Sequence, residues 1–271
     1  YRGTNVSWLC KNGYDSPASF LPYESNFLNT FPGGLLYTCG LRSAGPSNRD
    51  GDEYHPLHGR YHGTPAEQVC AFTEGDEIVV SGTVRETALF GHVLELKRLI
   101  RIPVYGSKVI VEDALTNLSP RDEEYMMIYH CNFGWPLVSP DLRFVVPEHP
   151  VEPRDDWAAQ GLQDWNKLCA PVPNFREQCF RHKLPADDNG LAAMVVENPK
   201  LGIGVRVAYD TATLPQLVQW KNCGANEYVL GLEPTCASLN GREADIAAGI
   251  MPQLQPGESR KFHVELSFYS L

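Results

Sequence analysis

The chain has 271 residues, of which 43% are hydrophobic and 21% charged, so it holds enough apolar side chain for a substantial core and lacks the composition of a disordered protein. Its formal net charge is −10 and it has no run of basic residues, which argues against nucleic acid as a partner. No apolar stretch reaches the roughly 18 to 20 residues that cross a bilayer, and the first residues do not resemble a signal peptide. We therefore expect a soluble protein without membrane or nucleic-acid partners.

The eight cysteines are scattered along the chain and include no CxxC pair. A chain of this length can build a core without disulfides, so this pattern favours a reducing compartment. We therefore expect the protein to be cytoplasmic.

Short β-branched segments with partly alternating polarity recur along the chain and predict antiparallel strands joined by turns. They cover residues 77–84, 92–102, 108–113, 192–197, 201–209, 217–220 and 261–269. Residues 154–168 open with acidic side chains and repeat apolar positions at helical spacing, which predicts one short helix. Because the strand pattern is alike on both sides of this proline-rich centre, we expect a single all-β domain over residues 1–271, although the length would allow two.

A first polar cluster lies at residues 55–62, where three histidines and an arginine fall within eight positions. In an extended segment His58, Arg60 and His62 would share one face and form a titratable surface. The plain alternatives are a solvated edge or a chance cluster of metal-ligating side chains. The density of histidines favours a functional site.

A second cluster follows an apolar run and lies at residues 129–136. In a strand His130 and Asn132 share one face, where an imidazole and an amide could contact one ligand. Phe133 faces the other way and is expected in the core. Trp135 faces that side as well, unless the following turn frees it to stack on a sugar.

A third candidate is Glu233, which ends an apolar strand and precedes a proline. Glutamate is rarely buried without a partner, so Glu233 is either at a solvated edge or a functional group with a shifted pKa. Upstream, Trp220 lies near the end of another predicted strand, where it suits a carbohydrate platform as well as a core.

Taken in order, these segments resemble the aldose 1-epimerase (galactose mutarotase) superfamily. The segment around His58 is similar to the Leu-His-Gly motif of that family, residues 129–133 are similar to its Asn-His-x-x-Phe segment, and Leu232-Glu233-Pro234 is similar to the strand that carries its catalytic glutamate. The resemblance extends from about Gly40 to the C-terminus. It implies a β-supersandwich of antiparallel sheets with one or two short helices, in which the first strand of the family pattern would precede residue 1.

The family reaction interconverts the α and β anomers of a free sugar without a cofactor. It needs an acid and a base on opposite sides of the ring, one to protonate the ring oxygen and one to take the proton of the anomeric hydroxyl. The resemblance implies that His130 is the general acid and Glu233 the general base. It also implies that His58 and Arg60 bind the sugar and stabilise charge on its oxygens.

Several positions depart from the family pattern. The arginine expected upstream of Leu-His-Gly has no clear counterpart, an arginine replaces the common second glycine after that motif, and the sugar-binding acid has no clean match. The alternatives left open are Arg42 and Arg49 for the arginine, and Glu177, which aligns best, or Asp187 and Asp188 for the acid. The choice among neutral, acidic and phosphorylated sugars therefore stays open.

Two other functions fit these residues. A carbohydrate-binding or sensing protein could keep the cleft and lose turnover, but binding alone requires no acid and base pair, and a binder would lack a two-limbed pH profile. A metal site could use His58, His62, His130 and Glu233 as ligands, because imidazole and carboxylate suit Zn or Mn. The epimerase resemblance accounts for the same residues without metal or cofactor. We therefore expect a monomeric or homodimeric isomerase acting on a small-molecule carbohydrate.

Overall fold

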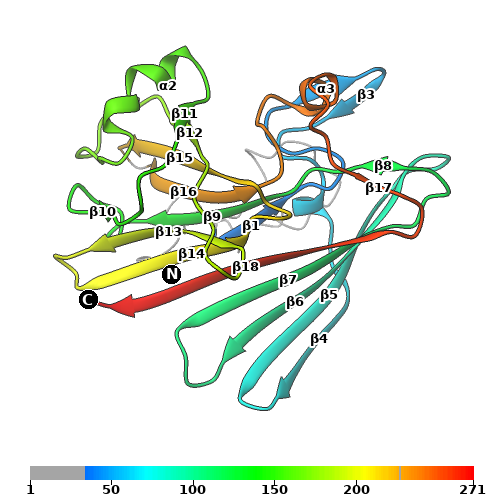
Figure 1. The fold of residues 1–271 in the computed structure, drawn as a ribbon, viewed down its shortest axis with the longest axis horizontal. Helices are drawn as coiled ribbons and strands as arrows, with labels where there is room; N and C mark the ends of the chain where they lie inside the picture. Colours follow the sequence, from blue (N-terminus) through cyan, green and yellow to red (C-terminus); the bar gives the residue numbers. More distant parts are fainter. Residues whose placement is uncertain (1–33, 226) are drawn as a thin grey trace.

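The computed structural model describes residues 34–225 and 227–271. These residues form two stacked antiparallel sheets, with β4 to β7 extending sideways beyond the smaller sheet (Figure 1). The smaller sheet has the strand order β1-β9-β16-β15-β12-β11, and the larger has the order β10-β13-β14-β18-β7-β6-β5-β4. This architecture confirms the all-β prediction. The strand expected before residue 1 lies outside the described residues.

The six strands of the smaller sheet come from both halves of the chain. They are β1 (Leu36–Cys39), β9 (Ile128–Gly134), β16 (Glu227–Thr235), β15 (Gln216–Gly224), β12 (Gln178–His182) and β11 (Val151–Pro153). Every neighbouring pair is antiparallel. The predicted strand that ends at Glu233 is therefore a central strand, and its neighbour β9 carries His130.

The eight strands of the larger sheet contain most of the segments predicted from alternation. They are β10 (Arg143–Phe144), β13 (Leu191–Asn198), β14 (Ile203–Asp210), β18 (Ser259–Ser270), β7 (Lys108–Asn117), β6 (Val93–Pro103), β5 (Glu77–Thr87) and β4 (Glu67–Glu74). Two small ribbons pair β2 (Asn48–Asp50) with β3 (Glu53–His55) and β8 (Glu123–Glu124) with β17 (Gln253–Leu254). The strand predictions for these segments are confirmed.

The main core lies between the sheets, and β9 shows how alternation separates core from site. Tyr129, Cys131 and Phe133 are fully buried in that core. His130 and Asn132 alternate with them and therefore face the other side of the sheet. Phe133 is confirmed as a core residue, whereas Trp135, just beyond the strand, is 57% exposed.

A buried polar cluster fixes the position of β9 against the larger sheet. The Arg98 guanidinium on β6 donates to both carboxylate oxygens of Asp113 on β7, at 2.8 and 2.6 Å. The Tyr129 hydroxyl on β9 donates to the same carboxylate at 2.6 Å, and Arg98 also reaches the Thr38 hydroxyl on β1 at 2.9 Å. A buried charge is tolerated only when it is paired and hydrogen-bonded, so this cluster constrains how the two sheets meet.

The helices are short. The predicted helix over residues 154–168 is present as α2 (Asp156–Gln160) and the 3-10 turn η3 (Leu162–Asp164), so it is broken near Gly161. The Asp155 carboxylate caps α2 by accepting from the Ala158 amide at 2.8 Å. A second helix, α3 (Arg242–Ala247), and the 3-10 turn η2 (Tyr61–Gly63) complete the elements. No helix in the described part is long and apolar enough to cross a membrane.

Candidate active site

The register of the smaller sheet brings His130, Glu233 and Trp220 together on the face opposite the main core. On β9 and β16, Cys131 pairs with Leu232, and the same register places His130 opposite Glu233. On β16 and β15, Gly231 pairs with Trp220. Residues that oppose one another across antiparallel strands project to the same face, so three adjacent strands each supply one side chain.

His130 and Glu233 are in direct contact. His130 Nε2 lies 3.1 Å from Glu233 Oε1, and the two residues are only 6% and 3% exposed. The His130 ring meets the rings of His58 and Trp220 edge to face, with 5.5 Å between centroids in both cases. The two predicted acid-base residues are therefore neighbours on one face.

Burial shifts both groups toward their uncharged forms. Burial raises the pKa of the Glu233 carboxyl well above its usual range, the Glu177 carboxylate raises it further, and the Arg154 guanidinium opposes the shift. Burial also lowers the pKa of His130 to about 4. Both shifts favour an uncharged carboxyl group beside an uncharged imidazole.

A glycine makes room for the carboxyl group. A Cβ atom at Gly231 would overlap Glu233 Oε1 and would lie 3.0 Å from the Cβ of Trp220. Gly231 pairs with Asn132 on one side and with Trp220 on the other, so it lies at the centre of the site. The Glu233 side chain consequently lies back over its own strand toward His130.

Trp220 and Glu177 form the next layer of the site. The Trp220 indole N–H donates to Glu177 Oε2 at 2.6 Å. The Arg154 guanidinium reaches Glu177 Oε1 at 3.4 Å and the Cys179 sulfur at 3.1 Å. Of the three acids left open by the sequence, Glu177 is thus the one in contact with Trp220. Asp187 instead accepts from backbone amides in the turn before β13.

The histidine-rich segment is not a strand, so the prediction that His58, Arg60 and His62 share a strand face is wrong. His58 has φ 62° and Gly59 has φ 76°, and η2 follows directly. A Cβ at Gly59 would overlap the carbonyl oxygen of Ser43, so only glycine fits this close approach. The resulting turn places the His58 ring against His130.

Arg60 and His62 leave the same turn in different directions. The His62 ring is 3.0 Å from the Tyr37 hydroxyl, and Tyr37 pairs with His130 across β1 and β9, so His62 borders the site. The 42% exposed Arg60 side chain donates to the Tyr54 carbonyl at 2.7 Å and lies 3.8 Å from the Glu86 carboxylate. Arg60 also lies 3.6 Å from the Glu53 carboxylate, so this predicted sugar ligand contacts a backbone carbonyl and two carboxylates in the structure.

The remaining predicted ligand, Asn132, is fully buried. Its amide donates to the His130 carbonyl at 3.0 Å and to the Gly34 carbonyl at 3.3 Å. These contacts make Asn132 a support for the strand that carries His130. Within the described residues, no group of three or more His, Cys, Asp or Glu side chains is arranged to hold a metal ion.

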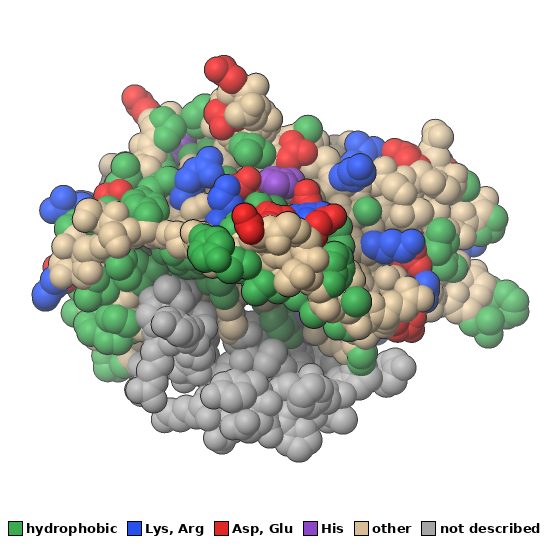
Figure 2. All heavy atoms as spheres, turned by 90° about the horizontal axis from the view of Figure 1, so that it is seen from below, with side chains coloured by type: hydrophobic (Ala, Val, Ile, Leu, Met, Phe, Trp, Pro, Cys, Tyr) green, Lys and Arg blue, Asp and Glu red, His purple; other side chains and the backbone are tan. Residues whose placement is uncertain are grey.

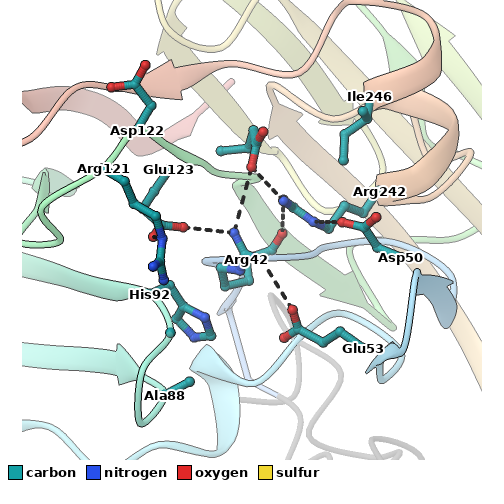
Figure 3. Close-up of a pocket in the computed structure, with 12 residues that line it drawn as sticks. Arg42, Asp50, Glu53, Ala88, His92, Arg121, Asp122, Glu123, Arg242 and Ile246 are labelled. Carbon is teal, nitrogen blue, oxygen red and sulfur yellow. Dashed lines mark hydrogen bonds and ion pairs between the residues drawn. The ribbon is translucent and has the colours of Figure 1, made fainter.

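A separate pocket of about 580 Å³ lies beside α3 and the β2–β3 ribbon, and Figure 3 shows the charged side chains that line it. Arg42 donates to Glu53 at 3.2 Å and to Glu123 at 3.1 Å there. Arg242, which is 2% exposed, donates to Asp50 at 2.9 Å and to Glu124 at 2.7 Å. Arg42, one candidate for the sugar-binding arginine, is therefore neutralised by carboxylates in this other pocket.

Comparison with known proteins places the chain in a family. The model of the domain of unknown function DUF4432 matches residues 1–268. The chain belongs to the DUF4432 family. A search of curated proteins gave no significant match to this DUF4432 chain.

Solved structures share the fold of this DUF4432 protein. A Klebsiella pneumoniae protein, provisionally described as an aldose 1-epimerase, superposes with a TM-score of 0.82 at 27% identity and covers 91% of the chain. The chain spans only 65% of the length of that protein. A galactose mutarotase-like protein from Clostridium acetobutylicum (TM-score 0.61, 16% identity, 85% of this chain and 79% of that one) shares the fold. A galactose 1-epimerase from Lactobacillus acidophilus also shares the fold, with a TM-score of 0.59 and 13% identity over 94% of this chain and 83% of that one. The galactose mutarotase-like fold implied by the sequence resemblance is confirmed.

Proposed function

We propose that this protein is an isomerase of the aldose 1-epimerase type, which interconverts the anomers of a free sugar with His130 and Glu233 as its acid-base pair. The observation that carries the proposal is the 3.1 Å contact between these two buried groups on adjacent central strands. A buried carboxyl beside a buried imidazole is costly to the fold, and such pairs with shifted pKa values gather at active sites. The likeness to the Klebsiella protein supports the same reaction class.

The contact is compatible with the chemistry, because the two oxygens that exchange protons in mutarotation are bonded to the same carbon. Two neighbouring groups can therefore reach both of them. With the resting proton on Glu233, ring opening begins when Glu233 protonates the ring oxygen and His130 takes the proton of the anomeric hydroxyl. Ring closure on either face of the aldehyde reverses the transfers. This proposal reverses the roles implied by the family resemblance, in which His130 protonates the ring oxygen and Glu233 takes the proton of the anomeric hydroxyl.

Trp220 and Glu177 are proposed to bind the sugar. The half-buried indole borders His130, where an aromatic ring can pack against the apolar face of a sugar. The Glu177 carboxylate can accept hydrogen bonds from hydroxyl groups. Figure 2 shows basic and acidic side chains interspersed on one face of the molecule.

The test measures the rate of anomer exchange, by polarimetry or exchange NMR, for a panel of aldoses, ketoses, uronic acids and sugar phosphates. His130→Ala and Glu233→Gln should each reduce the rate by about 10²-fold or more. Glu227→Gln, at the exposed start of the same strand, is the matched control and should retain full activity. Unchanged turnover in both site variants would refute the proposal.

The same samples distinguish an enzyme from a binding protein. A sugar that raises the melting temperature without faster anomer exchange would support the carbohydrate-binding alternative. Trp220→Ala should abolish the sugar-induced rise in melting temperature if the indole is a platform. If the indole serves only as packing, the variant melts lower but keeps the full sugar-induced rise.

A further inference from the structure

Two cysteines that are distant in sequence meet at one end of the smaller sheet. Cys169 lies in the segment between η3 and β12, and Cys223 lies near the end of β15. Tyr228 pairs with Cys223 across β15 and β16, and its hydroxyl donates to the carbonyl oxygen of Cys169. The Val172 amide donates to the Cys223 carbonyl at 2.9 Å. The segment around residues 169–172 is therefore fastened beside β15.

The side chains of the two cysteines also meet. The Cys223 side chain interacts with both the backbone and the side chain of Cys169, and neither cysteine is in a disulfide. Cys169 is exposed and Cys223 is buried. Thiols in contact need only a small side-chain movement to reach bonding distance, and an exposed member gives an oxidant access to the pair.

A buried lysine lies beside the two cysteines. The Lys221 side chain is 5% exposed, and its ammonium donates to the Asp164 carbonyl at 2.8 Å. Its charge acts on both thiols. Burial raises the pKa of the Cys223 thiol to about 11, whereas Lys221 acts in the opposite direction. Burial prevails at Cys223, so the exposed Cys169 is the thiol that an oxidant reaches first.

We propose that Cys169 and Cys223 form a reversible disulfide in response to hydrogen peroxide, so that the pair is an oxidisable site separate from the acid-base pair. The Cys169 thiolate attacks one oxygen of the peroxide, the O–O bond breaks, and a sulfenic acid and hydroxide result. The Cys223 sulfur then attacks the Cys169 sulfur and displaces the hydroxyl group as water. Two thiols lose two electrons and two protons, and one peroxide is reduced to two waters.

The disulfide would join the segment that follows α2 and η3 to β15, the strand that also carries Trp220. A covalent link between two segments so distant in sequence restricts the unfolded chain, so the oxidised protein should melt higher than the reduced one. Other cysteines offer a contrast. Cys131 and Cys179 are both buried, so an oxidant in solution does not reach their thiols directly.

The test treats the full chain with stoichiometric hydrogen peroxide, alkylates the remaining thiols and maps the peptides without reduction. We expect a linked peptide containing Cys169 and Cys223, a mass loss of about 2 Da per chain before alkylation, and reversal by dithiothreitol. The melting temperature should rise by about 5 °C on oxidation. Cys169→Ser, at an exposed position, should lose both effects, whereas Cys70→Ser, an exposed cysteine on β4, should keep them.

Two outcomes would overturn the proposal. One is oxidation of wild-type Cys169 to sulfinic acid without any peptide linked to Cys223. The other is a disulfide that joins Cys169 to a second molecule. Because Cys169→Ser leaves the buried Cys223 in place, its result does not depend on whether Cys223 variants fold.

Discussion

Acidification should unfold this protein through histidines that are buried in uncharged form. Burial lowers the pKa of His55, His92 and His130 to about 4, and that of His182 to about 3. An unfolded histidine titrates near 6.5, so the unfolded state binds protons that the folded state excludes. These histidines therefore leave the free energy of unfolding unchanged above about pH 6.5, and they lower it as the pH falls from 6.5 toward 4.

The magnitude follows from these pKa values. At pH 5 each such histidine costs the folded state about 2 kcal/mol, so four together cost about 8 kcal/mol. That is comparable to the whole stability of an ordinary domain, about 5 to 15 kcal/mol. The urea midpoint should therefore fall steeply between pH 7.5 and pH 5.

His182 allows a sharp single-site test. Its ring is 2.8 Å from His149 and 3.0 Å from the Gln219 side chain, so His182→Gln should destabilise the protein at pH 7.5. The same variant removes one proton-binding site from the unfolded state. Its loss in free energy of unfolding relative to wild type should therefore be about 2 kcal/mol smaller at pH 5 than at pH 7.5. Urea unfolding of wild type and variant at both pH values measures the difference. An equal deficit at both would refute the argument that this histidine is held uncharged.

Three further predictions concern glycines and the carboxyl of the site. Gly231→Ala should lower the rate of anomer exchange by about tenfold or more with little change in circular dichroism, because its Cβ would displace the Glu233 carboxyl. Glu233→Gln should gain stability relative to wild type, and this gain should be larger at pH 8 than at pH 5, because a raised carboxyl pKa disfavours the folded state only where the unfolded group is ionised. An equal difference between the two urea midpoints at both pH values would contradict this. Gly59→Ala should destabilise the fold by about 3 kcal/mol in urea unfolding, because a Cβ there overlaps the Ser43 carbonyl at positive φ, and a wild-type midpoint would contradict it.

Alternation along the chain predicted most of the long strands and the two faces of β9, but it did not predict β4, β11 or β12. The sequence separates Phe133, which is buried, from His130 and Asn132 because side chains of a strand alternate between faces. The same logic indicated that Glu233 ends an apolar strand. The contact between His130 and Glu233 depends on the pairing of β9 with β16, and such pairing between distant segments leaves no local signal in the sequence.

Sequence reasoning did not predict the features that depend on backbone conformation or on charges from distant segments. The positive φ values of His58 and Gly59 turn a segment that looked extended. Arg60 lies near the carboxylates of Glu53 and Glu86, and these belong to other strands, so no local pattern indicated the contacts. The meeting of Cys169 and Cys223 likewise arises only from the fold, since their spacing matches no cysteine motif.

The hydrogen bond from Tyr129 to Asp113 has a consequence for the opposite side of β9. A shift of this strand by one residue would turn the tyrosine away from its carboxylate and would bury the His130 imidazole between the sheets. The core-facing bond thereby selects which residues of β9 are presented for chemistry. An engineer who redesigns the outer face of this sheet can vary its side chains freely only while the anchor behind it stays in place.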